Sequence, residues 1–270
     1  MNLDFLSLYK IISKLKTLFW KNSKIIYINS NKKNQNVNKI DELIPTKDRK
    51  WVICQSNTKF GYKFYKHHLF KMKKRLFDIT RNLSETDQLV YSGFVSPMFA
   101  AYDGYVLGDN RNYIFIDTDS NSTDAYKIEY KKRFLKNYEF NDEQYEEINV
   151  FFSCSTDINM SEFKGKNLYF NKKSKNKVDT KYLQEVYSYT KSLLDYSNKN
   201  NVKRVNMYIA AKQPVSFIIG TAIRSGHPKV FIYEYSNGKY TLPLLIQDGK
   251  ILKNECKWWI IKIVRCIQSW

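Results

Sequence analysis

Glycine and proline are scarce in this chain, at 9 and 5 of 270 residues. Loops that wrap phosphate groups need closely spaced glycines, because only a backbone without a Cβ atom can approach the ligand so closely. No GxxxxGK[ST], GxGxxG or GxSxG motif is present, which argues against P-loop hydrolases, dinucleotide-dependent dehydrogenases and α/β-hydrolases. Because no catalytic motif is recognised, the sequence predicts a protein that is not an enzyme.

Cysteine is also rare, and its positions are far apart in the sequence. The four residues are Cys54, Cys154, Cys256 and Cys266, with no CxxC pair and no metal-ligand spacing to His67, His68 or His227. A disulfide framework or a zinc site needs paired or closely spaced ligands. We therefore predict no metal, no cofactor and a reducing compartment.

Long apolar runs are missing. The most lipophilic stretches, Phe5–Trp20 and Trp258–Ile267, are short and carry Lys or Arg, whereas a membrane-spanning helix needs about 18 or more apolar residues. The N-terminus lacks the small-residue cleavage site of a signal peptide. These features predict a cytoplasmic protein.

Acidic residues are in the minority, with 26 Asp and Glu against 45 Lys and Arg, which gives a net charge of +19. Residues 1–85 hold 19 basic and 6 acidic residues, and residues 86–250 hold 22 and 19. The excess in the first segment fits a nucleic-acid or membrane-surface partner. It also fits a coding sequence rich in A and T, because Lys, Asn, Ile, Tyr and Phe are all abundant.

The basic N-terminal segment contains an amphipathic pattern at residues 5–20, typical of a helix that lies on a membrane or packs on its own domain. Residues 30–50 are polar and contain Pro45, as in a linker. We divide the chain into this segment at 1–49, with the helix, a candidate strand and the linker, a body at 50–250 and an apolar, basic tail at 251–270.

The body alternates between β and α patterns. Strands are predicted at 51–54, 88–91, 113–117, 148–154, 205–210, 229–235 and 239–246, and helices at 62–82, 97–107, 180–198 and 214–224. Such alternation is typical of βαβ units. The predicted fold class is therefore α/β with largely parallel, Rossmann-like sheets.

An internal repeat relates the two halves of the body at an offset of 117 residues. Tyr91 matches Tyr208, Pro97 matches Pro214, and the strand at 113–117, ending in Asp117, matches the one ending in Glu234. The repeat predicts two similar lobes, at about 50–145 and 146–250, related by a pseudo-two-fold axis.

Two turns follow matching strands and lead into proline-initiated helices: SGFVSP at 92–97 and AAKQP at 210–214. Ligands of parallel sheets bind at the carboxyl ends of strands, and the N–H groups at a helix N-terminus attract phosphate. Two such turns facing each other suit a pseudo-symmetric, anionic ligand.

Three segments resemble SAVED domains: VYSGFVSPMFAAYDGYVLG at 90–108, INVFFSCSTDI at 148–158 and the region 207–246. SAVED domains are sensors of bacterial CBASS anti-phage systems and of some type III CRISPR effectors. The resemblance implies two fused CARF-like lobes, a bound cyclic tri- or tetranucleotide, self-association on binding and an associated effector protein. Ser96 stands where many members have a histidine.

The candidate ligand-binding residues surround the two turns and the strand between them. Lys212 suits a phosphate and Gln213 a base edge, and Phe94 suits base stacking. For each candidate a purely structural role is the alternative, and Asp117 with Asp119 is better explained as a polar turn than as a Mg²⁺ site. The full set is Phe94, Ser96, Arg111, Tyr126, Ser153, Ser155, Lys212, Gln213 and Pro214.

A second hypothesis assigns residues 1–85 to nucleic-acid binding, as a nuclease accessory protein, or to a membrane-surface effector. Binding through phosphate contacts would weaken steeply with salt. Both options are compatible with a sensor in the rest of the chain.

Overall fold

The structure is a computed structural model of the chain, and its description covers part of the residues. These are 26–29, 69–70, 72–74, 76–78, 81, 88–92, 96–117, 124–128, 136–141, 143–159, 163–173, 178–236 and 239–252. Every statement below about something absent refers to these residues.

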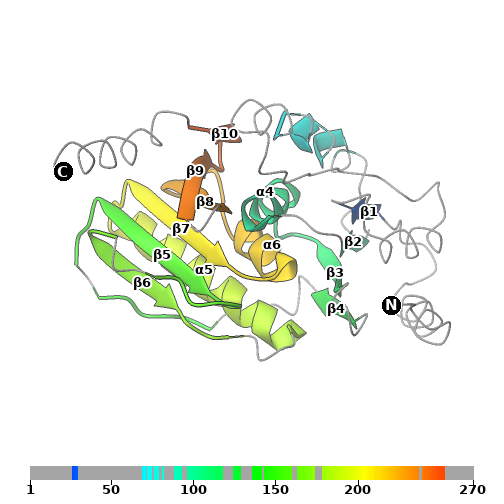
Figure 1. The fold of residues 1–270 in the computed structure, drawn as a ribbon, viewed down its shortest axis with the longest axis horizontal. Coiled ribbons are helices and arrows are strands. Elements are labelled where there is room, and N and C mark those ends of the chain that lie inside the picture. Colours follow the sequence, from blue (N-terminus) through cyan, green and yellow to red (C-terminus); the bar gives the residue numbers. More distant parts are fainter. Residues whose placement is uncertain are drawn as a thin grey trace, which may run out of the picture.

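The described strands form two sheets (Figure 1). The first has the order β1-β2-β3-β4, with β1 at Ile26–Asn29, β2 at Gln88–Ser92, β3 at Asn112–Asp117 and β4 at Asp124–Ile128. The second has the order β10-β9-β8-β7-β5-β6, with β5 at Glu147–Ser153, β6 at Lys166–Phe170, β7 at Arg204–Ala210, β8 at Lys229–Ser236, β9 at Lys239–Leu245 and β10 at Lys250–Ile251. Three helices are described over their full length: α4 at Pro97–Leu107, α5 at Thr180–Lys199 and α6 at Gln213–Thr221. Residues 69–70, 72–74, 76–78 and 81 are also helical and fall within the helix predicted at 62–82.

The same unit occurs in both sheets. In the first sheet, α4 connects β2 to its parallel neighbour β3, and β4 then pairs antiparallel with β3. In the second, β7 runs parallel to β8 through α6, and β9 returns antiparallel to β8. The predicted α/β class with largely parallel sheets is therefore confirmed, and matching topology underlies the sequence repeat.

The two helices of the repeat, α4 and α6, lie between the sheets (Figure 1) and cross through two glycines. A Cβ atom on Gly104 would lie 2.0 Å from the carbonyl oxygen of Phe217, and one on Gly220 would lie 1.8 Å from that of Ala101. Contacts this short exclude any side chain at either glycine. The backbones of the two lobes therefore touch directly.

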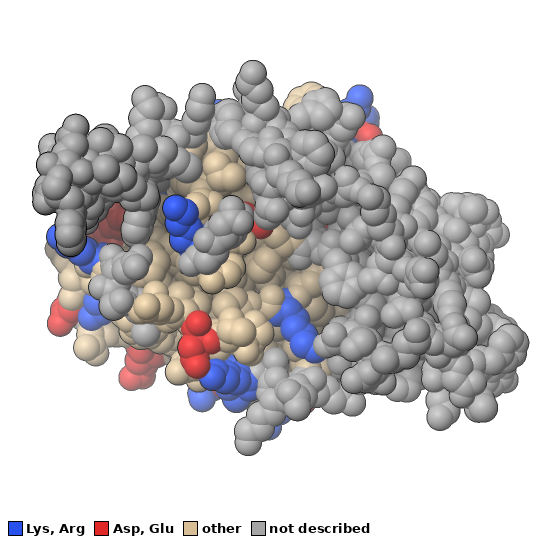
Figure 2. All heavy atoms as spheres, in the orientation of Figure 1, with Lys and Arg blue, Asp and Glu red and all other residues tan. Residues whose placement is uncertain are grey.

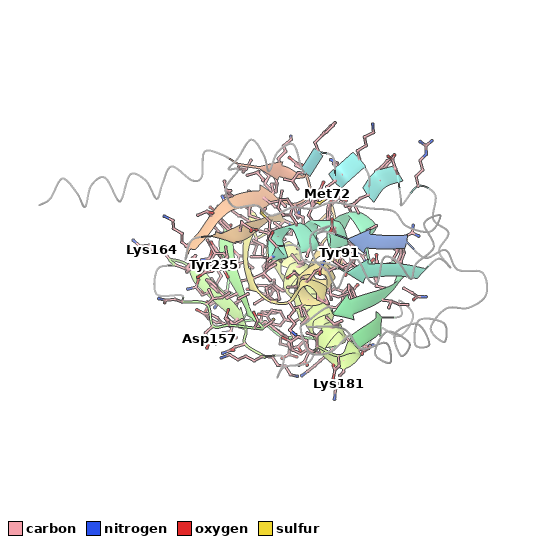
Figure 3. The ribbon with its side chains drawn as sticks, turned by 45° about the vertical axis from the view of Figure 1, so that its right-hand side comes forward. Met72, Tyr91, Asp157, Lys164, Lys181 and Tyr235 are labelled. Carbon is pink, nitrogen blue, oxygen red and sulfur yellow. The ribbon has the colours of Figure 1, made fainter. Side chains whose placement is uncertain are left out.

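An aromatic cluster joins the lobes beside this crossing. Phe217 of α6 packs on Tyr91, Tyr113 and Phe115 of the first sheet, with ring centroids 4.4, 4.9 and 5.2 Å away. All four side chains are at most 1% exposed. Figure 3 shows Tyr91 in the interior, whereas Asp157, Lys164 and Tyr235 lie at the outside of the second sheet. The lobes thus share one core and do not merely touch at a surface.

The second sheet is covered differently on its two faces. On one face, Tyr189 of α5 packs against Phe152 and Phe170. On the other, the rings of Tyr169, Phe151, Tyr208 and Tyr233 stack across four neighbouring strands, with centroids 5.4, 5.0 and 4.7 Å apart. Because alternate residues of a strand point to opposite faces, Phe151 contributes its ring to one face of the sheet and Phe152 to the other.

Most predicted elements agree with the observed ones. The strands predicted at 88–91, 113–117, 148–154, 205–210, 229–235 and 239–246 and the helices at 97–107 and 180–198 match within about two residues. The helix predicted at 214–224 ends earlier, at Thr221, because the chain tightens there through an i to i−3 bond from Ile223 N to Gly220 O. The sequence-based prediction missed β4, β6 and β10, whereas β1 lies in the N-terminal segment for which a strand without bounds was suggested.

Several predictions concern residues outside the described ones: the helix at 5–20, the strand at 51–54, Asp119, His67 and His68, and most of the basic segment and the C-terminal tail. The proposed domain boundaries stay predictions, although β1 pairs in parallel with β2 and so brings part of residues 1–49 into the first sheet. In the described part, no helix has the length and apolar character needed to cross a membrane.

The helix crossing leads to a stability prediction. Replacing Gly104 or Gly220 by Ala places a methyl group inside the opposing backbone, so the helices must separate. We expect the free energy of unfolding to fall by at least about 3 kcal/mol for each variant, measured by urea denaturation.

Gly226→Ala is the matched control, because a Cβ atom at Gly226 meets nothing within 4 Å. Its effect should stay below about 1 kcal/mol. Equal stability of the Gly104→Ala variant and the control would contradict the close crossing.

Candidate functional site

The carboxyl edge of the second sheet collects most of the predicted site residues. Strands β5, β7 and β8 are parallel neighbours, and Ser153 at the end of β5 pairs in register with Ala210 at the end of β7. Glu234 lies near the end of β8, directly beyond the Tyr208 and Tyr233 pair. Loop residues that follow β5 and β7 therefore meet Glu234 at one edge of the sheet.

The N-terminus of α6 lies at this edge. Lys212 is its N-cap residue and makes no capping hydrogen bond with its side chain, which differs from the usual Ser, Thr, Asp or Asn cap. Pro214 is buried in the first turn, where its missing N–H is tolerated. A helix start with a lysine cap and no carboxylate in its first turn favours an anion.

The N-terminus of α4, from the other lobe, also reaches the carboxyl end of the second sheet. Ser96 is its N-cap, is 8% exposed and accepts a hydrogen bond from the N–H of Phe99 at 3.5 Å. The Ser96 hydroxyl also makes a side-chain hydrogen bond with Glu234. This contact links the first helix of one lobe to the strand end of the other.

Glu234 is 3% exposed, and its Oε2 atom has no hydrogen-bond partner among the described residues. Burial raises the pKa of this carboxyl to about 7, against a lowering effect of the hydrogen bond to Ser96. The Nε2 atom of Gln213 is also buried without a partner in the described structure. The edge thus holds one unpaired acceptor and one unpaired donor.

Ser153 and Ser155 shape the loop that follows β5. The Ser153 hydroxyl accepts a bond from the N–H of Ile158 at 3.4 Å, and the N–H of Ser155 donates to the carbonyl of Ala210 at 2.9 Å. Ser155 is exposed, whereas Ser153 is buried. These bonds fix the loop against the end of β7, next to Lys212.

Three predicted residues are not part of this cluster. Arg111 precedes β3 and follows α4, so it lies at the amino end of the strand, the opposite edge from the helix N-termini. Tyr126 is in the middle of β4, in register with Phe115. Phe94 lies outside the described residues.

Charges of both signs are interspersed over the described surface (Figure 2), with no large patch of one sign on the face shown. This agrees with the near balance of 22 basic and 19 acidic residues at 86–250. Within the described part of the chain, no three His, Cys, Asp or Glu side chains gather so as to hold a metal ion.

Solved structures share this architecture. An Acinetobacter baumannii Cap4 SAVED/CARF-domain containing receptor with the cyclic trinucleotide 3'3'3'-cAAA matches 82% of this chain at 15% identity and a TM-score of 0.55. The same receptor with 2'3'3'-cAAA matches 87% of this chain at 14% identity and a TM-score of 0.54. The Moraxella osloensis Cap4 SAVED/CARF-domain containing receptor matches 87% of this chain at 16% identity and a TM-score of 0.52. This chain has the SAVED/CARF fold.

The chain covers about half of those longer chains, 51% to 53%. No family model matches the sequence, and no curated protein matches it. At such low identity, the comparison shows that this chain and the SAVED/CARF receptors share a fold.

The candidate ligand-binding residues predicted from the sequence did not include Glu234. A signal was present, because an acidic residue ends an apolar strand and is matched in the repeat by Asp117. The pattern alone places that residue at a strand end but cannot show that its neighbours bury it.

Two buried carboxyls predict a pH dependence of stability. The pKa of Asp103, to which Tyr91 donates at 2.6 Å, is also raised to about 7 by burial. For both carboxyls the folded pKa lies above the unfolded values of 3.8 and 4.5. The contribution of each protonated carboxyl to the free energy of unfolding is therefore complete below about pH 4 and is lost as the pH rises to about 7. Each contributes on the order of 3 kcal/mol.

The free energy of unfolding between pH 5 and 8 tests this. Asp103→Asn and Glu234→Gln should each flatten its decline with pH. Curves parallel to that of the unmodified protein would show that neither carboxyl titrates in this range.

Proposed function

We propose that this protein is a receptor for a cyclic oligonucleotide, with a tri- or tetranucleotide as the ligand. The observation that carries the proposal is that both helix N-termini lie at the carboxyl end of the second sheet: Ser96, the N-cap of α4, contacts Glu234 of β8, and α6 begins directly after β7, the neighbouring strand. The shared fold with receptors solved with cyclic trinucleotides supports it.

The α6 start provides the phosphate-binding part of this mechanism. Lys212 supplies a positive charge at the helix cap, and the helix dipole favours a negative group at the same place. The bases of the ring would then extend toward Gln213, Ser96 and the loop that follows β5.

Ligand binding between the lobes gives a way to transmit the signal. A cyclic oligonucleotide that contacts both α4 and α6 favours whichever lobe arrangement it fits best, to the extent of its differential affinity. We propose that this favoured arrangement self-associates and activates a separate effector in anti-phage defence, within the cytoplasm.

Binding is measured first. Titration calorimetry against cyclic di-, tri- and tetranucleotides should find a tri- or tetranucleotide ligand, and Lys212→Ala should weaken its binding about tenfold, because one charge-assisted contact to phosphate is lost.

Lys229→Ala is the matched control, since Lys229 is an exposed lysine at the amino end of β8, the opposite edge of the sheet. It should bind as the unmodified protein does. Absence of binding to every member of the panel would refute the proposed function.

Self-association is tested separately, by sedimentation velocity with and without the ligand found by calorimetry. We expect the mean sedimentation coefficient to rise on ligand addition. An unchanged value with saturating ligand would contradict the assembly step while leaving the receptor function in place.

A further inference from the structure

The unpaired atoms Glu234 Oε2 and Gln213 Nε2 are unusual for the interior of a folded domain. Both are buried, and neither has a hydrogen-bond partner among the described residues. A buried polar atom without a partner costs about 1 to 3 kcal/mol, and such atoms are rare in native structures. Two of them at the same sheet edge point to a partner that binds from outside the chain.

Their positions are fixed by the framework. Gln213 is the first residue of α6, which follows β7, and Glu234 lies on β8, the parallel neighbour of β7. Adjacent strands are about 4.8 Å apart. The hydrogen bond with Ser96 orients the Glu234 carboxyl toward the start of α4.

The chemistry of the two atoms is complementary to one kind of group. An oxygen of a carboxylate accepts, and an amide nitrogen donates. A ligand that satisfies both must present a donor next to an acceptor. Adenine and cytosine present this pair as an exocyclic amino group beside a ring nitrogen, whereas guanine and uracil present a ring N–H beside a carbonyl oxygen.

A phosphate suits this position less well than the start of α6, because the Glu234 carboxyl repels it once the carboxyl is ionised. The positive end of α6 and Lys212 suit a phosphate instead. The two parts of the edge therefore suit different parts of a cyclic oligonucleotide: the start of α6 suits a phosphate, and the side chains of Glu234 and Gln213 suit a base.

We propose that Glu234 accepts a hydrogen bond from the exocyclic amino group of a ligand adenine, while Gln213 donates to its neighbouring ring nitrogen, so that the 6-amino group of the base contributes directly to affinity. The proposal rests on the proposed receptor function. It makes Glu234 a specificity-determining residue.

Burial of the carboxyl strengthens such a contact. At 3% exposure, Glu234 has already lost its water in the folded protein, so a ligand donor meets an acceptor that needs no further desolvation. The ligand must displace the atoms that now cover Oε2. Selectivity gained in this way depends on the amino group itself rather than on the size of the base.

The experiment compares cyclic triadenylate with the same ring built from purine nucleotides that lack the 6-amino group. At about pH 8, above the Glu234 pKa of about 7, the unmodified protein should bind the triadenylate roughly 10- to 100-fold more tightly, the range for a hydrogen bond to a charged acceptor. In Glu234→Met, which keeps the length of the side chain but has no strong acceptor, this ratio should fall to about 1.

Glu234→Gln retains an acceptor oxygen and should keep part of the preference. Glu146→Met, which removes an exposed carboxylate at the amino side of β5, is the matched control and should keep all of it. Thermal unfolding without ligand verifies that each variant folds. A merely structural role of Glu234 would change affinity for both rings equally.

The outcomes separate the two proposals. If the unmodified protein binds cyclic oligonucleotides but Glu234→Met still distinguishes the two rings, the role of Glu234 is wrong and the receptor function stands. Equal binding of both rings by the unmodified protein would likewise overturn the role of Glu234 alone. If no cyclic oligonucleotide binds, the receptor function itself fails, and the proposed base contact fails with it.

Discussion

The close crossing of α4 and α6 is the constraint on which the rest of the structure depends. Gly104 lies against the carbonyl of Phe217, and Gly220 lies against that of Ala101, so the distance between the lobes is set by backbone contact rather than by adaptable side chains. Because packed interiors do not deform continuously, the crossing also fixes where the two helix N-termini emerge. A ligand site between the lobes, as proposed above, needs such a rigid spacing.

The aromatic cluster beside the crossing explains why the lobes fold as one unit. Phe217 belongs to the second lobe by sequence, but its ring neighbours are Tyr91, Tyr113 and Phe115 of the first sheet. Separating the lobes would expose all of these rings, at a cost of about 25 cal/mol for every Å² of apolar surface. A small four-stranded sheet thereby gains a core that it could not fill alone.

The fold was predictable from the sequence to a large extent because the repeat constrains it twice. Each strand before a proline-initiated helix has a counterpart in the other lobe, and Pro97 and Pro214 mark both helix starts. The missed strands lack such signals. β6, with the sequence KNLYF, is an edge strand with mostly half-buried side chains. β4, with the sequence DAYKI, has two charged residues among five and follows a turn-rich segment.

The site was predicted less completely, for a physical reason. Lys212, Gln213 and Ser96 lie next to prolines in the turns and are visible in the sequence as loop residues near helix starts. Glu234 looks like the polar end of a strand, and only packing from the other lobe makes it a buried carboxyl. Arg111 was selected because it begins a strand of the repeat, but the amino end of a strand lies opposite the helix N-termini.

The Ser96 and Glu234 contact finally connects recognition to the arrangement of the lobes. The hydroxyl that caps α4 is shared between Phe99 of its own helix and a carboxyl of the other lobe. Any group that binds Glu234 changes the charge and hydrogen bonding felt by that cap, and so acts on α4 without touching it. Because α4 is fixed against α6 through Gly104, such a change moves the two helices together or not at all. Under the proposed receptor function, a ligand would therefore act on α4 and α6 as one unit, and would favour one lobe arrangement only by the difference between its affinities for the two.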